Sequence, residues 1–133
     1  MKFMIIQNYG GVEKDIEPMP NWKPEEIEAH MAYQGAVHRE LEERGELVGG
    51  EGLSSPDQAK FVRSDGTGTP VVTDGPFPES KELVAGYRIV DVESLDRALE
   101  IAAKVSAAPG PNGEPIEQAI EVREVLSAPP SFE

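Results

Sequence analysis

The sequence predicts an α+β protein with a ferredoxin-like, split βαβ arrangement, in which two helices cover one face of an antiparallel sheet and an extra β-hairpin is added. Two segments, 24–44 and 94–105, carry apolar residues at helical spacing, and segments with strand-like alternation surround each of them. Two short β-runs, 59–64 and 69–74, flank a glycine-rich reversal and indicate the hairpin.

The first half of the chain is predicted to form a strand, a helix and a second strand. Residues 2–9 are apolar, partly β-branched and followed by two glycines, which is typical of a strand. The helix over 24–44 has a proline at its first position and acidic residues in its first turn, where the helix dipole favours them. Gly45 suits the left-handed end of that helix, and the glycines within residues 46–53 allow the next strand to bend or bulge.

The second half adds a strand, a helix and a final strand after the hairpin. Residues 81–92 are expected to form the central strand, because apolar side chains alternate on both of its faces. Asp91, or Glu93 and Ser94, can start the second helix, and the loop 107–115, rich in proline and glycine, ends it. The alternation of apolar and charged residues in 118–126 predicts the last strand.

Length and charge limit the class of protein. The 133 residues suit one domain, predicted over residues 1–127, with a tail at 128–133. The formal net charge of -13 repels phosphate backbones and anionic lipids, so no direct nucleic-acid or membrane partner is expected. The chain has no cysteine, and its start has too short an apolar run for a signal peptide or a membrane span. A cytoplasmic protein is therefore expected.

The central strand also predicts self-association. Helices on one face of the sheet leave the other face uncovered, yet the segment 83–90 is apolar on both faces. A second subunit that packs sheet against sheet would cover the remaining face. We therefore expect a homodimer.

The segment VVTDGPFPESKE, residues 71–82, joins the hairpin to the central strand and contains the candidate site. Pro76 and Pro78 restrict the backbone, so the segment is expected to be stiff. A stiff loop at a strand end holds Asp74 and Phe77 in fixed positions, as a general base or a ligand clamp requires. The alternative is that Asp74 accepts hydrogen bonds in an Asx turn while Phe77 fills the core.

The two histidines of the chain lie on the first predicted helix. A helical projection places His38 in one apolar stripe with Gln34, and places His30 at the edge of that stripe. We expect His38 to point toward the sheet or the dimer cavity, where an aspartate such as Asp74 can orient it as a proton shuttle. The alternative for both histidines is a structural role with a backbone or carboxylate hydrogen-bond partner.

The motif TDGPF with ESKE after it, together with GELVGGEGL, ESLDRALEIAAK and IEVREV, resembles the DGPF branch of the YCII-related family over most of the chain. The resemblance implies a ferredoxin-like fold that dimerises into an α/β barrel. A histidine and an aspartate in family members suggest enzymatic activity, and family genes near those of alternative sigma factors suggest a role around transcription. The position at which the YCII branch carries its helix histidine falls on or near Gln34 in this chain.

Two functions of different classes are compatible with these residues. The first is a small cofactor-free enzyme that transfers a proton on a small organic molecule, with Asp74 and His38 as catalytic residues. Its expected substrate contacts are Gln34, Gly75, Pro76, Phe77 and Glu82. The second is a non-enzymatic module that senses a ligand or docks a regulatory protein, in connection with transcription. The sequence has no metal-ligand spacing, P-loop or dinucleotide motif, so neither a metal nor a nucleotide cofactor is expected.

Overall fold

The computed structural model describes residues 1–8, 16–17, 19–74 and 84–126. These residues form the predicted elements in the predicted order: β1 (Lys2–Asn8), α1 (Pro24–Glu43), β2 (Leu47–Gly52), β3 (Lys60–Arg63), β4 (Val71–Asp74), β5 (Val84–Asp91), α2 (Leu95–Ser106) and β6 (Ile120–Glu124). The element ends differ from the predicted ones by a few residues, and the predicted strand positions 9 and 81–83 lie outside the described residues.

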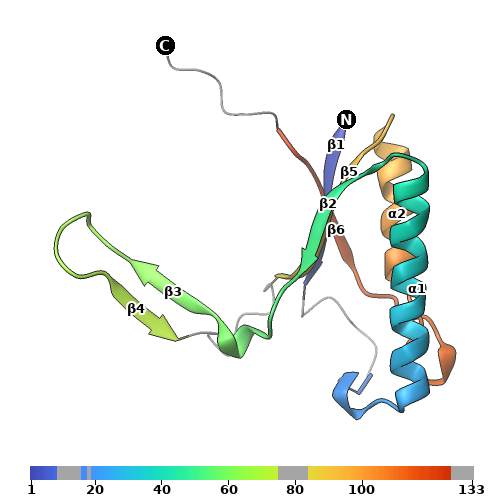
Figure 1. The fold of residues 1–133 in the computed structure, drawn as a ribbon, viewed down its shortest axis with the longest axis horizontal. Coiled ribbons are helices and arrows are strands. Elements are labelled where there is room, and N and C mark those ends of the chain that lie inside the picture. Colours follow the sequence, from blue (N-terminus) through green and yellow to red (C-terminus); the bar gives the residue numbers. More distant parts are fainter. Residues whose placement is uncertain (9–15, 18, 75–83, 127–133) are drawn as a thin grey trace.

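Four strands form one antiparallel sheet in the order β2-β5-β1-β6. The helices α1 and α2 cover the same face of this sheet (Figure 1). Strand β5 lies between β1 and β2, which confirms the predicted central strand. Strands β3 and β4 form a separate hairpin, so the architecture is the predicted ferredoxin-like α+β fold with an added hairpin. No helix within the described ranges is long and apolar enough to cross a membrane.

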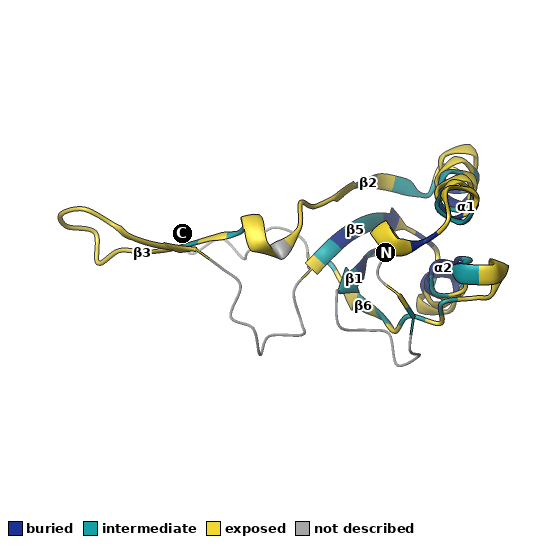
Figure 2. Cartoon of the chain, turned by 90° about the horizontal axis from the view of Figure 1, so that it is seen from below, coloured by how far each residue is buried: buried dark blue, intermediate teal, exposed yellow. Residues whose placement is uncertain are grey.

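The core fills the layer between the sheet and the helices (Figure 2). Its buried members come from β1, β5, both helices and the turn before α2: Phe3, Ile5, Val37, Leu41, Val90, Val92, Ala98, Ile101, Ala102 and Val105. Removing this apolar surface from water is the main favourable term in folding. The hydrophobic core that stabilises the fold therefore lies on the helix-covered face of the sheet.

The other face of the sheet, which we call the open face, is also apolar at its centre. Met4 pairs with Ile89 and Ile6 pairs with Tyr87 across β1 and β5, so these four side chains share one face. Ile6 is buried and the other three are half-buried. The predicted alternation of apolar residues on both faces of the central strand is confirmed for the residues that the structure describes.

The hairpin and its turn, residues 60–74, form what we call the arm. The arm extends away from the sheet on the side opposite to the helices (Figures 1 and 2). Every residue of β4 is exposed. The cross-strand pair Val62 and Val72 is 61% and 58% exposed, so the arm presents apolar side chains to solvent.

The helix ends follow the signals in the sequence. The backbone N–H of Lys23 donates to a carboxylate oxygen of Glu26 (2.9 Å), which is one half of a capping box. Gly45 has a φ of 70° after the last turn of α1, in the left-handed region that favours glycine. Ser94 is the N-cap of α2, and its hydroxyl accepts a hydrogen bond from the N–H of Arg97 (3.2 Å).

A nearly buried ion pair fixes the start of α2 to the turn between α1 and β2. The Nε and Nη2 atoms of Arg97 donate to the two carboxylate oxygens of Glu46 at 2.9 and 2.8 Å. Arg44 donates to the same carboxylate, and Arg97 also pairs with Glu100. The hydrogen bonds from Arg97 lower the pKa of Glu46 to about 2, against the opposing effect of burial. The same pair raises the pKa of Arg97.

This ion pair predicts a specific acid sensitivity. The pKa of Glu46 is lower in the folded state, so its contribution to the free energy of unfolding is complete above about pH 4.5 and is lost as the pH falls toward 2. Replacing Glu46 with Gln should therefore lower stability at neutral pH by about 1 to 3 kcal/mol, with allowance for solvent screening. Urea unfolding at several pH values measures the difference, which should shrink as the pH falls below about 4.5.

The control is Glu43→Gln, because Glu43 is exposed near the end of α1. It removes the same charge and should change stability by less than about 0.5 kcal/mol. A Glu46→Gln deficit that stayed constant from neutral pH down to pH 2 would show that the ion pair is not its cause.

Candidate functional site

A hydrogen bond between two side chains, Arg88 on β5 and Gln34 on α1, joins the sheet to the helix. Arg88 lies two residues before the buried Val90 on β5, so its side chain is on the helix-covered face. Its Nη2 atom donates a hydrogen bond of 2.8 Å to the Oε1 atom of Gln34 on α1. Gln34 was among the predicted site residues, whereas Arg88 was missed. The available signal was a lone arginine in the apolar run VAGYRIV.

The charge of Arg88 is not balanced by a carboxylate within the described residues. Arg88 is half-buried, and the acceptor that the structure gives its guanidinium is a neutral carboxamide. Burial lowers the pKa of Arg88, although an arginine side chain remains charged at neutral pH. No fully buried side-chain nitrogen of the described residues lacks a hydrogen-bond partner, so the Arg88 nitrogens that Gln34 leaves unbonded are not fully buried.

The glycines of β2 allow the strand to lie close to Arg88. Gly50 is opposite Arg88 in the β2–β5 pairing. A Cβ atom on Gly50 would lie 2.5 Å from the carbonyl oxygen of Tyr87 and 2.8 Å from the Cα atom of Arg88, which is too close. The pairing shifts between Leu47 and Gly49, which confirms the predicted bend or bulge.

Asp74, the predicted catalytic carboxylate, ends β4 at the base of the arm. Its side chain is 77% exposed and forms an ion pair with Lys60, its cross-strand neighbour. The arm lies on the opposite side of the sheet from α1 (Figure 1), so the described residues of one chain do not bring Asp74 to Gln34 or His38. The neighbouring predicted substrate contacts Gly75, Pro76, Phe77 and Glu82 lie outside the described residues.

Of the two predicted directions for His38, the one toward the sheet is wrong, and the one toward a dimer cavity stays a prediction. Its side chain is 50% exposed, and its Nε2 atom lies 3.3 Å from a carboxylate oxygen of Glu42, one turn further along α1. The buried residues of α1 are His30, Val37 and Leu41, so the buried stripe is rotated relative to the predicted one. His38 therefore lies on the outer side of the helix.

His30 has the surroundings expected of a structural histidine, which was the alternative prediction for both histidines. Its ring is buried, and its Nδ1 atom lies 2.9 Å from the carbonyl oxygen of Pro109. A carbonyl accepts only, so this hydrogen bond places the proton on Nδ1. The ring of Trp22 packs edge-on against the imidazole at a centroid distance of 5.6 Å. Trp22 was not predicted to contribute, and its contact helps to bury His30 within the rotated stripe.

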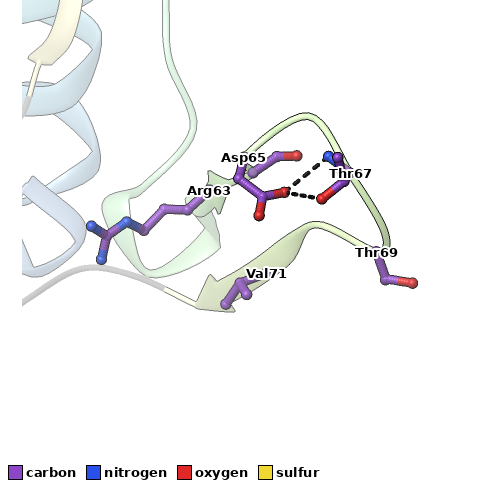
Figure 3. A pocket seen from close by; sticks show the side chains of 6 residues that line it. Arg63, Asp65, Thr67, Thr69 and Val71 are labelled. Atoms are coloured by element: carbon purple, nitrogen blue, oxygen red, sulfur yellow. Dashed lines mark hydrogen bonds between the residues drawn. The ribbon is translucent and has the colours of Figure 1, made fainter.

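A shallow hollow lies at the tip of the arm (Figure 3). Asp65 accepts hydrogen bonds from the N–H (2.9 Å) and the hydroxyl (2.8 Å) of Thr67, which close the turn. These bonds lower the pKa of Asp65. The side chain of Arg63 points away from Asp65 (Figure 3), so the hollow is a turn closed by its own hydrogen bonds. In the described part of the chain, no three histidine, aspartate or glutamate side chains are grouped as a metal site would require.

The fold and the Arg88–Gln34 contact define a small ferredoxin-like α+β protein with a cation between its sheet and one helix. The chain matches the YCII-related domain over residues 1–126. It is also similar to an uncharacterised protein of Rhizobium meliloti (strain 1021), with 36% identity over 102 residues that cover 77% of each chain. The chain therefore belongs to the YCII-related family, as the sequence predicts.

Because β2 lies close to β5 at Arg88, substitution of two adjacent glycines by alanine should affect stability differently. Gly50→Ala should lower the free energy of unfolding by about 1 to 3 kcal/mol, because its methyl group would collide with the backbone of β5. Gly49→Ala is the control, since a Cβ atom there would meet nothing within 4 Å. Urea unfolding of both variants measures the difference, and equal stabilities would contradict the close approach of β2 to β5.

Proposed function

We propose that this protein binds a small organic anion through the guanidinium of Arg88, which Gln34 holds in position. The observation that carries the proposal is a half-buried cation whose described acceptor is a neutral carboxamide. A cation removed from water without a counter-charge costs free energy, and a bound anion would offset that cost. The planar fork of a guanidinium matches carboxylate and phosphate groups with paired hydrogen bonds.

The charge of the whole chain supports a localised anion site. With a net charge of -13, most of the surface repels anions. Binding then depends on a place where a cation is held apart from the surrounding carboxylates. Arg88 satisfies this condition among the described residues, whereas Arg97 is already paired with Glu46 and Glu100.

The chemistry of the two groups favours binding or sensing over proton transfer. An arginine stays protonated at neutral pH, and the carboxamide of Gln34 does not take up a proton. His38 faces outward, which counts against its predicted part in catalysis. Proton transfer at Asp74 stays a prediction, as does membership of the DGPF branch, which the TDGPF motif supports.

Calorimetric titration tests the proposal with three probes of similar shape: benzoate, phenyl phosphate and the neutral benzamide. The wild-type protein should bind at least one of the two anions and not benzamide. Arg88→Met should weaken that binding by about tenfold or more, because hydrogen bonds between charged groups are worth about 1.5 to 3 kcal/mol. Arg39→Met, which removes an exposed arginine from α1, is the matched control and should bind as the wild type does.

A second variant separates loss of the site from loss of the fold. Gln34→Glu places a carboxylate beside Arg88, where it should pair with the guanidinium and exclude an external anion while keeping the fold. Arg88→Met should also be as stable as the wild type, because an apolar side chain often replaces a buried charge without loss. Unchanged anion binding by Arg88→Met would overturn the proposal.

We further propose that the protein is a homodimer that packs open face against open face. The support is the apolar centre of that face, formed by Met4, Ile6, Tyr87 and Ile89. A second sheet at the usual face-to-face distance of about 10 Å would cover the surface that Met4, Tyr87 and Ile89 still expose. This arrangement is also what the family resemblance implies.

Light scattering during gel filtration tests this association. The wild-type protein should have twice the mass of one chain, and Ile89→Lys should have the mass of one chain, because a lysine would be buried without a partner. Leu99→Lys is the control, since Leu99 is 47% exposed on α2, on the other side of the molecule. A wild-type monomer at high protein concentration would contradict the dimer.

A further inference from the structure

We infer that the arm, residues 60–74, docks on a second copy of this chain. The inference rests on the proposed homodimer and goes beyond it, because it assigns an interface to a segment that lies outside the sheet. It follows from the exposure, position and charge of the arm.

The arm leaves a pair of apolar side chains in water. Val62 and Val72 form a cross-strand pair on one face of the arm, and both are more than half exposed. Lys60 and Asp74 form an ion pair on the same face, beside the two valines. A two-stranded hairpin is at best marginally stable in water without a packing partner. The valine pair is therefore the part of the arm that a partner would cover.

The position of the arm selects the partner. The arm extends from the same side of the sheet as the open face (Figures 1 and 2). A second copy packed on the open face would place its sheet about 10 Å away and its helices beyond that, beside the arm. In a dimer with two-fold symmetry, each arm would lie against the body of the other copy. One occupant then covers both the open face and the valine pair.

The charge of the arm is consistent with this contact. Two basic residues, Lys60 and Arg63, balance two acidic residues, Asp65 and Asp74, so the arm has no formal net charge. The charge of -13 therefore lies in the rest of the chain. The negatively charged parts of two copies repel each other. A segment without net charge, such as the arm, can approach the second copy at a lower electrostatic cost. Added salt should strengthen the dimer for the same reason.

Intermolecular paramagnetic broadening tests the contact directly. The chain has no cysteine, so Thr69→Cys at the arm tip gives a single attachment point for a nitroxide. This spin-labelled protein is mixed with isotope-labelled wild-type protein, in which only contacts between copies cause broadening. Backbone amides of the wild-type sheet and helices should broaden. A nitroxide at Glu43→Cys, near the end of α1, is the control and should cause no such broadening.

Charge insertion gives the second readout. Val62→Lys with Val72→Lys should weaken the dimer by about tenfold or more, because two apolar contacts become charged. Anion binding at Arg88 should not change. The matched control is Leu95→Lys with Leu99→Lys, which alters two leucines of α2 that are 48% and 47% exposed. It should leave the dimer intact.

The outcomes separate the proposals. A wild-type monomer, or a dimer that shows no broadening from the arm and survives the valine changes, would overturn the docking of the arm. Capture of an unrelated protein by the valine face in place of a second copy would overturn it as well. Loss of anion binding in Arg88→Met alone bears on the proposed ligand site and leaves the arm unaffected.

Discussion

The alternation of side chains along β5 determines where the core, the Arg88–Gln34 contact and the open face lie. Because this strand lies between β1 and β2, its register assigns every second residue to the helix layer and every other residue to the open face. Val90 thereby enters the core and Arg88 meets Gln34, while Tyr87 and Ile89 face away from the helices. A slip of one residue would exchange the two sets and remove both the core contact and the proposed ligand site.

Two arginines near the core show how the same side chain serves two purposes. Arg97 has carboxylates on either side, and the ion pair with Glu46 holds the start of α2 to the preceding turn. Arg88 has a carboxamide in place of a carboxylate, so its position is fixed but its charge is not neutralised within the described residues. The first arrangement stabilises the fold, and the second is the one for which we propose an anionic ligand.

The sequence predicts most of the fold because its signals are local. Helical periodicity, the capping serine at Ser94 and the glycine after α1 each act within one turn, and the structure has them where the pattern indicates. The phase of the α1 stripe is different, because packing of Trp22 and the Pro109 carbonyl around His30 sets it. Pro109 is 79 residues from His30 in the chain, so periodicity alone places His38 inward and His30 at the edge. Arg88 was missed for a related reason, since its partner Gln34 is 54 residues away.

Anion binding at Arg88 can be observed on its side-chain Nε–Hε resonance in a nuclear magnetic resonance titration with benzoate and phenyl phosphate. This resonance should shift in a saturable way with at least one of these anions and not with benzamide, while the resonance of the ion-paired Arg97 stays in place. A Gln34→Glu variant should show no titration of Arg88. If the Arg88 resonance does not respond to either anion, or if exposed arginines such as Arg39 respond equally, Arg88 is not an anion site.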